Sequence, residues 1–125
     1  MQHTHRALVI EDDDDIRRLL EMVLTQAGFG VDAVSTGNEG VAAAASGDYA
    51  LISVDVGLPD INGLEVVRRV RPHFTGKIVM VSARSSVGDQ ASGHGAGADL
   101  YLTKPFRPRE LKQKFVDLMS PAEAG

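Results

Sequence analysis

Five short, largely apolar runs, separated by stretches of helical periodicity, restrict the fold of this chain more than any other feature. They occupy residues 7–10, 31–34, 51–54, 77–81 and 100–102. Strands that are apolar on both faces are typical of a parallel sheet that helices cover on both sides. The alternation therefore predicts an α/β fold, in which five βα units form a doubly wound parallel sheet with right-handed crossovers.

The stretches between these runs carry the signals of helices. Helices are expected over residues 15–27, 39–46, 64–70 and 85–97, and after Pro108. In the first stretch the apolar residues recur at spacings of three and four, so they lie on one face. Gly28 is placed to end this helix and Pro72 to end the third. Glycines weaken the stretch 85–97, where we expect an irregular or mobile segment.

Length and composition exclude several classes of protein. The chain has 125 residues, which fits one domain (1–125) with a core over about residues 6–119 and a loose tail at 120–125. The polar start and the lack of a long apolar stretch predict neither a secretion signal nor a membrane helix. Without cysteine there are no disulfides, and we expect a cytoplasmic protein. The net charge of −4 does not favour a surface that binds nucleic acid.

Reactive side chains follow four of the five predicted strands. Glu11 and Asp12 come after the first strand, Asp55 after the third, Ser82 after the fourth and Lys104 after the fifth. In an open parallel sheet, ligands bind beyond the carboxyl ends of the strands. We therefore expect three carboxylates, a hydroxyl and an ammonium at one edge of the sheet.

Such a group of side chains is suited to phosphoryl chemistry. Three converging carboxylates repel one another at neutral pH, and a hard divalent cation, Mg²⁺ or Mn²⁺, relieves that repulsion. Lys104 adds a second positive charge and Ser82 a hydroxyl donor. Phosphoryl transfer needs mainly positioning and neutralisation of charge. The central carboxylate, Asp55, is then the candidate nucleophile, which would form an acyl phosphate.

Four stretches that contain these residues resemble a known family. They are residues 7–17, 51–65, 79–84 and 97–106. Together, and in this order, they resemble the receiver domain of two-component response regulators, of the chemotaxis (CheY-like) type. The resemblance covers about residues 7–119. It implies a flavodoxin-like fold with strand order 2-1-3-4-5.

The resemblance also implies a role for each acidic residue of the site. Asp55 matches the phosphoacceptor. Glu11 and Asp12 match the acidic pair that binds Mg²⁺ together with Asp55, and Gly57 matches the position whose backbone carbonyl is a further ligand. Glu11 stands where the family usually has Asp. Gly57 leaves the phosphoryl group open to water, against which Arg84 could act as a shield.

The remaining matched positions concern phosphoryl binding and switching. Ser82 and Lys104 match the residues that bind the phosphoryl oxygens. Tyr101 matches the aromatic switch residue, whose rotamer follows the position of Ser82. The resemblance further implies a cis bond between Lys104 and Pro105.

The family also suggests partners. A sensor histidine kinase or a phosphotransfer protein would donate the phosphoryl group. A downstream partner, which the sequence does not identify, would bind the face formed by the fourth helix, fifth strand and fifth helix. That face could also form a homodimer. No membrane or nucleic acid would be bound by this domain, and no external substrate would be turned over.

Three other functions remain open at this point. A Mg²⁺-dependent aspartyl-nucleophile phosphatase usually has a second Asp two residues after the nucleophile, where this chain has Gly57. A nucleotide- or flavin-binding domain needs a glycine-rich loop after the first strand, where this chain has five acids. A receiver-like scaffold that works without phosphorylation is compatible with Glu11 and Gly57.

Other polar residues are interpreted as structural: helix-start acids, turn residues and an exposed helix face. In that order, they are Asp14 and Asp15; Asp60, Asn62 and Gly63; and Arg68, Arg69 and Arg71. The first residues of the chain, with His3 and His5, are expected to be disordered. His73 and His94 are interpreted as solvated surface residues.

Overall fold

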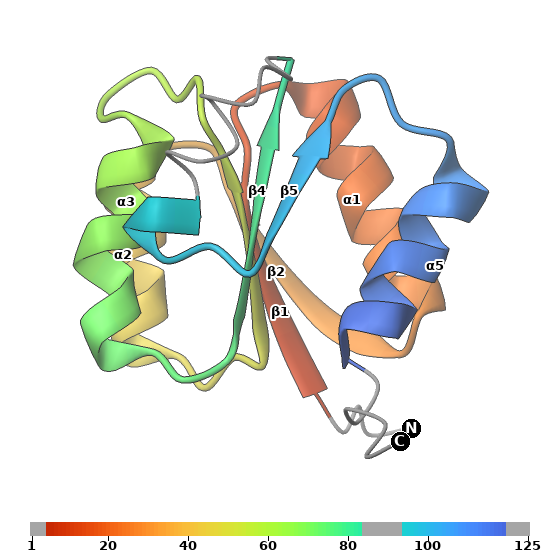
Figure 1. Cartoon of the computed structure of the whole chain (residues 1–125), viewed down its shortest axis with the longest axis horizontal. Coiled ribbons are helices and arrows are strands. Elements are labelled where there is room, and N and C mark those ends of the chain that lie inside the picture. Colours follow the sequence, from red (N-terminus) through yellow and green to blue (C-terminus); the bar gives the residue numbers. More distant parts are fainter. Residues whose placement is uncertain (1–4, 84–93, 120–125) are drawn as a thin grey trace.

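Five parallel strands form a single sheet, in the order β2-β1-β3-β4-β5 (Figure 1). The structure is a computed structural model, and it describes residues 5–83 and 94–119. The strands are β1 (His5–Ile10), β2 (Phe29–Val34), β3 (Leu51–Asp55), β4 (Lys77–Ser82) and β5 (Leu100–Thr103). The predicted fold class and strand order are confirmed.

Helices cover both faces of the sheet, as the doubly wound fold requires. They are α1 (Asp14–Gln26), α2 (Gly37–Ser46), α3 (Gly63–Val70), the short 3₁₀ helix η1 (Arg71–His73) and α5 (Pro108–Met119). Helices α1 and α5 lie on one face, and α2 and α3 lie on the other (Figure 1). Residues 94–96 are helical. Gly97, the last residue of the helix predicted at 85–97, is instead a turn residue with φ at +122°, and residues 85–93 lie outside the described residues.

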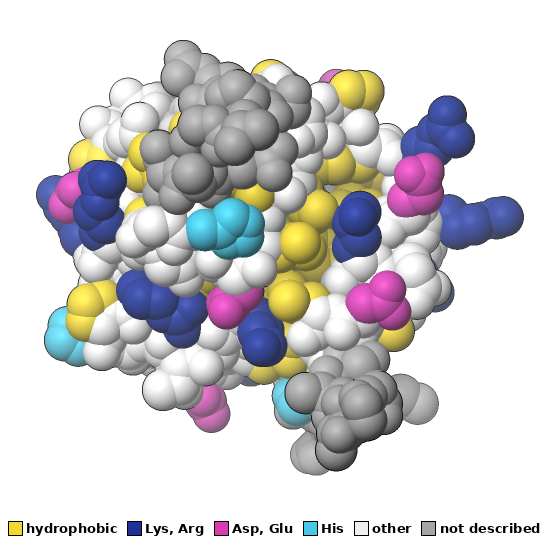
Figure 2. Space-filling model, in the orientation of Figure 1, with side chains coloured by type: hydrophobic (Ala, Val, Ile, Leu, Met, Phe, Trp, Pro, Cys, Tyr) yellow, Lys and Arg dark blue, Asp and Glu magenta, His cyan; other side chains and the backbone are white. Residues whose placement is uncertain are grey.

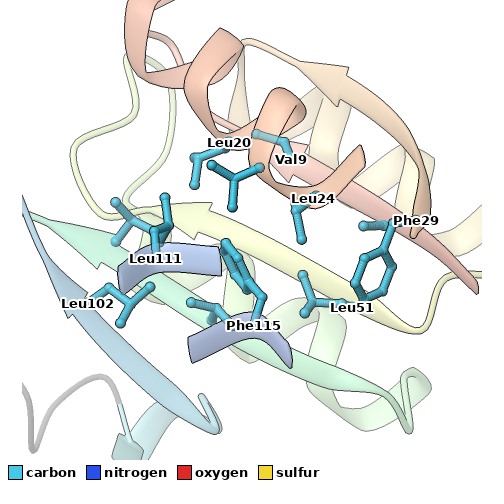
Figure 3. Packing of buried hydrophobic residues seen from close by; sticks show 12 residues of the cluster. Val9, Leu20, Leu24, Phe29, Leu51, Leu102, Leu111 and Phe115 are labelled. Atoms are coloured by element: carbon cyan, nitrogen blue, oxygen red, sulfur yellow. The ribbon is translucent and has the colours of Figure 1, made fainter. Parts of the chain in front are cut away.

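The strands supply two apolar layers because successive side chains point to opposite faces. In β1, Ala7 and Val9 belong to the core under α1 and α5, whereas Leu8 and Ile10 belong to the core under α2 and α3. Figure 3 shows Leu20 of α1 and Phe115 of α5 packed against the first of these layers. All six side chains are fully buried. The centre of the sheet is therefore packed on both faces, and the residues at its carboxyl edge continue from that close-packed core.

Local signals place the start and the end of α1 close to the predicted positions. The Asp13 side chain caps the helix by accepting a hydrogen bond from the Ile16 amide at 3.0 Å. Gly28 follows the helix with φ at +102°, a conformation that glycine adopts at little cost. The helix spans Asp14–Gln26, one residue earlier than predicted.

Two expectations about the ends of elements are wrong. His5 is the first residue of β1, not part of a disordered start, and its ring lies 6.3 Å from that of Phe29. Arg71 does not belong to an exposed helix face. It is half-buried, and it donates hydrogen bonds to the carbonyls of Phe74 and Gly76.

Within the part of the chain that the structure describes, every helix is too short or too polar to cross a membrane.

Candidate functional site

The predicted site residues come together at the carboxyl edge of the sheet. Glu11 follows β1, Asp55 ends β3, Ser82 ends β4 and Lys104 follows β5. A pocket of about 410 Å³ opens there. It is lined by Asp12, Asp13, Asp55, Val56, Gly57, Asn62, Ser82, Ala83 and Lys104. The parallel register is what gathers residues so distant in sequence.

Backbone hydrogen bonds continue beyond the strands and fix the residues at this edge. The Glu11 amide donates to the Val34 carbonyl at 3.1 Å. The Lys104 amide donates to the Ser82 carbonyl at 2.7 Å. These bonds extend the pairing of the sheet to Glu11 and Lys104, one residue beyond the strands that precede them.

Three carboxylates converge at this edge of the sheet, two of them lining the pocket. One oxygen each from Glu11, Asp12 and Asp55 lies within 4.8 Å of the others. Glu11 and Asp55 are buried, and Asp12 is exposed. Buried carboxylates at this separation raise the free energy of the ionised state unless positive charge is nearby.

Lys104 supplies part of that positive charge. Its Nζ lies 3.3 Å from Glu11 Oε1 and 3.3 Å from Asp55 Oδ1. Burial by itself would lower the pKa of Lys104. The negative charges of Asp55 and Glu11 outweigh that effect, so its pKa lies above the ordinary value. The side chain therefore remains an ammonium throughout the physiological range.

One ammonium does not neutralise the pocket. Burial raises the pKa of Glu11 to about 7; the charge of Asp55 adds to this shift, and Lys104 opposes it. Burial also raises the pKa of Asp55, again against the effect of Lys104. Glu11 Oε2 accepts a hydrogen bond from the Asp13 amide at 3.2 Å. Glu11 Oε1 is buried without a hydrogen bond of good geometry, although it has the ion-pair contact with Lys104.

These residues fit a hard divalent cation. The donors are carboxylate oxygens, which Mg²⁺ prefers, and a buried carboxylate oxygen lacks a hydrogen-bond donor. Gly57 lines the same pocket, and a Cβ built on it would approach only Asp55 Oδ2, at 3.9 Å. The backbone at Gly57 is therefore open to the pocket, as a carbonyl ligand must be.

The other predicted residues lie beside this group. Ser82 is buried and lines the pocket. Tyr101 is half-buried, and it packs against the core on the side of α2 and α3. The Lys104–Pro105 peptide bond is cis. Arg84, named above as a shield for the phosphoryl group, lies outside the described residues.

Gly63 has a role that its sequence pattern does not reveal. A turn residue is expected here, but Gly63 does not have a positive φ. A Cβ at this position would lie 2.2 Å from the backbone oxygen of Asp55 and 2.8 Å from Val56 Cα. Glycine is needed because α3 begins in direct contact with the backbone of Asp55. The Asn-Gly pair is the sequence signal, and Asn62 caps α3 by accepting from the Leu64 amide at 2.7 Å.

A parallel sheet in this order, with a lysine and three acids at its carboxyl edge, defines a receiver-type α/β domain. The chain belongs to the response regulator receiver domain family, whose model matches residues 7–116. It is thus the receiver domain of a two-component response regulator.

Curated relatives agree with this assignment. The chain is 41% identical over 104 residues to the response regulator ArlR of Staphylococcus haemolyticus, covering 83% of this chain and 48% of ArlR. It is also 41% identical over 105 residues to the uncharacterized transcriptional regulatory protein YkoG of Bacillus subtilis, covering 83% and 46% of the two chains. The chain thus spans about half the length of these relatives.

Solved structures share the fold over nearly the whole chain. The chemotaxis protein CheY4 of Vibrio cholerae has a TM-score of 0.85 at 28% identity, covering 92% of this chain and 98% of CheY4. The response regulator protein TrrA of Thermotoga maritima, in complex with Mg²⁺-BeF, has a TM-score of 0.82 at 35% identity. The alignment covers 93% of this chain and 100% of TrrA.

Proposed function

We propose that this domain accepts a phosphoryl group on Asp55 in a Mg²⁺-dependent reaction and changes its output surface in response. The observation that carries the proposal is the position of Asp55. It is buried among two further acids and Lys104, at the end of the central strand β3. A structural carboxylate would be paired by nearby donors. Here three acids surround a single lysine. Such an excess of negative charge is what a phosphoryl-transfer site that binds a metal ion requires.

The transfer step follows from the chemistry of the carboxylate. A sensor histidine kinase or a phosphotransfer protein would present a phosphohistidine. An oxygen of Asp55 attacks the phosphorus, the new O–P bond forms and the N–P bond breaks. The imidazole keeps the electron pair of that bond and takes up a proton from water. The product is an acyl phosphate on Asp55 and a free histidine on the donor.

Residues around Asp55 would neutralise the charge of the transferred group. Glu11, Asp12, Asp55 and the Gly57 carbonyl would hold Mg²⁺. When bound, the cation supplies charge neutralisation at the phosphoryl oxygens. Lys104, whose Nζ is already 3.3 Å from Asp55 Oδ1, would pair with a phosphoryl oxygen. The Ser82 hydroxyl would donate a hydrogen bond to another.

The same group would bias a two-state switch. Movement of Ser82 towards the phosphoryl group would make room for Tyr101, which is half-buried on the neighbouring strand β5, opposite Met80, two residues before Ser82. The output surface would be the face of the fourth helix, β5 and α5. Its described part has a hollow of about 170 Å³ between β5 and α5, and Figure 2 shows apolar side chains there. Leu102, Phe106 and Leu111 are among its lining residues.

Such a surface suits a protein partner or a second copy of the domain. We do not expect turnover of an external substrate, since the acyl phosphate is the signal. Gly57 gives no steric protection against water, so a short lifetime of the phosphorylated state is expected. We expect the domain to be cytoplasmic.

An intact-mass measurement tests the proposal. The protein is incubated with acetyl phosphate, with and without Mg²⁺. We expect the mass of one phosphoryl group to appear with Mg²⁺ and to be lost with EDTA. Asp55→Asn should abolish the gain, and Asp15→Asn, which changes an exposed acid at the start of α1, should retain it.

Two outcomes would count against the proposal. Phosphorylation undiminished in Asp55→Asn would place the phosphoacceptor elsewhere. No uptake at all, even within milliseconds of mixing, would favour a scaffold that works without phosphorylation. Steady hydrolysis of an aryl phosphate would instead favour a phosphatase.

A further inference from the structure

The loop between β3 and α3, residues 56–62, directly follows Asp55 and contains the proposed carbonyl ligand Gly57. Its two ends are fixed to the sheet and to each other. The Val56 amide donates to the Val81 carbonyl at 3.0 Å, and the Gly63 amide donates to the Val56 carbonyl at 3.0 Å. The middle of the loop belongs to no helix or strand, so its position depends on other contacts.

Asp60 makes those contacts with α2. Its two carboxylate oxygens accept from the amides of Gly37 and Asn38, both at 2.7 Å. These are the first two residues of α2, and the third amide, of Glu39, donates to Thr36 Oγ1 at 3.1 Å. Among the residues that the structure describes, the bonds of Asp60 are the only hydrogen bonds between residues 57–61 and another element. The start of α2 therefore has two caps, one local and one from the loop.

Helix α2 is in turn fixed against the acidic end of β1. A Cβ built on Gly40 would lie 2.4 Å from Ile10 Cδ1, so the helix rests directly on that side chain. Ile10 immediately precedes Glu11. At the start of α2, a Cβ on Gly37 would lie 2.5 Å from Ile61 Cγ1, so the loop and the helix are also in close contact. Asp60 thus ties the loop to the element that rests on β1.

We infer that Asp60 is a positioning residue for the Mg²⁺ pocket. By capping α2 from the loop, it sets the distance between Gly57 on one side of the pocket and Glu11 and Asp12 on the other. Asp60 itself is exposed and does not line the pocket, so it acts through the loop. The inference rests on the proposed function for the identity of the cation.

Electrostatics support a firm tie between Asp60 and α2. The amides of Asn38 and Gly37 are among the donors that lower the pKa of Asp60, with Asn38 the larger contribution. A carboxylate at a helix N-terminus is also stabilised by the helix dipole. Asp60 is therefore ionised at neutral pH and makes two charge-assisted hydrogen bonds, which are shorter and stronger than neutral ones.

Thr36 provides a matched control because it caps the same helix, and in the described residues its hydroxyl bonds with Glu39 rather than with the loop. Asp60→Ala and Thr36→Ala each remove one cap of α2, and each should cost a similar ~1 kcal/mol of stability. Mg²⁺ is titrated into both variants and the wild type, and binding is followed by amide chemical shifts. Amide shifts of residues 57–61 are also compared in the metal-free proteins.

We expect Asp60→Ala to weaken Mg²⁺ binding about 10-fold, the lower end of the range for residues that support metal ligands indirectly. Thr36→Ala should bind within about two-fold of wild type, because it leaves the loop contacts intact. Asp60→Asn, which retains one acceptor oxygen, should fall between wild type and Asp60→Ala. Equal Mg²⁺ affinities in Asp60→Ala and wild type would overturn the inference, and so would equal losses in Asp60→Ala and Thr36→Ala.

Failure of the proposed function gives a different result. If the wild type binds no Mg²⁺, the metal assignment is wrong, and the metal-free spectra still decide the role of Asp60. Shifts of the amides of residues 57–61 that are confined to Asp60→Ala would support positioning of the loop. Identical loop shifts in the two alanine variants would contradict it.

Discussion

Two groups of charged residues lie at opposite edges of the sheet and accommodate partly buried charge in different ways. At the carboxyl edge, Glu11, Asp12 and Asp55 surround Lys104. At the amino edge, Arg71 lies between the segments that lead into β4 and β5, and it pairs with Asp99 at 3.2 Å.

The group at the amino edge is well paired. Besides Asp99, the Arg71 guanidinium donates to the carbonyls of Gly97 at 3.1 Å, Gly76 at 2.8 Å and Phe74. It also lies 5.6 Å from the centre of the Phe74 ring. Asp99 accepts in addition from the Ile78 amide at 2.8 Å. Each charge has several partners, which is typical of a structural network.

The group at the carboxyl edge is not balanced. Lys104 is shared between two acids, and the pKa of Glu11 is raised to about 7 by burial and by Asp55. A fold does not need such a group for its stability. The difference teaches that unbalanced buried charge, rather than buried charge alone, marks the functional site.

The largest loss of stability is expected at Gly63, which lies directly against the backbone of Asp55. In Gly63→Ala the new Cβ would meet the Asp55 carbonyl oxygen at 2.2 Å, and the backbone must move to relieve the contact. We expect a loss of about 3 kcal/mol of unfolding free energy, at the upper end for overpacking. Gly57→Ala is the control, since open space surrounds it, and it should change stability by less than ~0.5 kcal/mol. Urea unfolding of both variants measures the difference, and equal losses would contradict it.

The second-largest loss of stability is expected from the Arg71–Asp99 group at the amino edge of the sheet. Arg71→Ala leaves Asp99 without its counter-ion and deprives the carbonyls of Gly76 and Gly97 of a donor. Because the pair is partly exposed, water replaces some of these bonds, and we expect a loss of about 2 kcal/mol. Thermal and urea unfolding test this value. Arg71→Lys should retain less than half of the contribution, because an ammonium cannot span the same acceptors. If Arg71→Ala leaves the unfolding free energy unchanged, the hydrogen bonds and ion pair of Arg71 do not contribute to stability.

Removing a negative charge from the acidic pocket should stabilise the protein, in contrast to the two substitutions above. The pKa of Glu11 is raised from 4.5 in the unfolded chain to about 7 in the folded protein. Its contribution to stability is therefore fully present below pH 4.5 and is lost as the pH rises through about 7. Above about pH 7 the buried Glu11 carboxylate is ionised at a cost in free energy. Glu11→Gln removes that cost, so at pH 8 the unfolding free energy of the metal-free protein should rise by ~1–3 kcal/mol.

Urea unfolding at pH 5 and pH 8 tests the sign for Glu11→Gln, and Asp15→Asn serves as the control. The gain should be larger at pH 8. Added Mg²⁺ should stabilise the wild type more than Glu11→Gln, because ligand binding to the folded state shifts unfolding by mass action. A destabilised Glu11→Gln at pH 8 without Mg²⁺ would show that Lys104 already compensates the pocket.

The smallest effect is expected on the surface of α3. Arg69 pairs with Glu65 at 2.9 Å, one turn away, and both side chains are about half-exposed. Such pairs contribute little, so Arg69→Ala should cost at most ~0.5 kcal/mol. If Arg69→Ala costs as much stability as Arg71→Ala, then an arginine in an exposed ion pair contributes as much as a half-buried arginine with several partners.

Most of the fold could be predicted from the pattern of apolar residues. Each strand was predicted to within two residues, and Gly28 ends α1 with the conformation that the sequence suggested. The acids after β1 and β3 were found because parallel strands bring their carboxyl ends to one edge. The family assignment, which the comparisons confirm, depended on the same motifs. The roles of the individual site residues stay predictions.

Long-range contacts between side chains and backbone escaped prediction. Arg71 follows Arg68 and Arg69 in a basic stretch, and nothing local distinguishes it. It becomes a structural residue because the segments before β4 and β5 pass beside it. Asp60 was interpreted as a turn residue for the same reason, since its partners are the amides of α2, 23 and 22 residues earlier.

The sequence by itself determined the alternation of strands and helices, the caps of α1 and the ends of strands at which acids lie. These depend on side-chain period and on contacts within a few residues. The tertiary structure alone decided which charges are balanced. Whether an acid meets a lysine, a helix amide or another acid depends on chain segments brought together by the sheet. Burial then raises the pKa of Glu11, and the contact with α2 lowers that of Asp60.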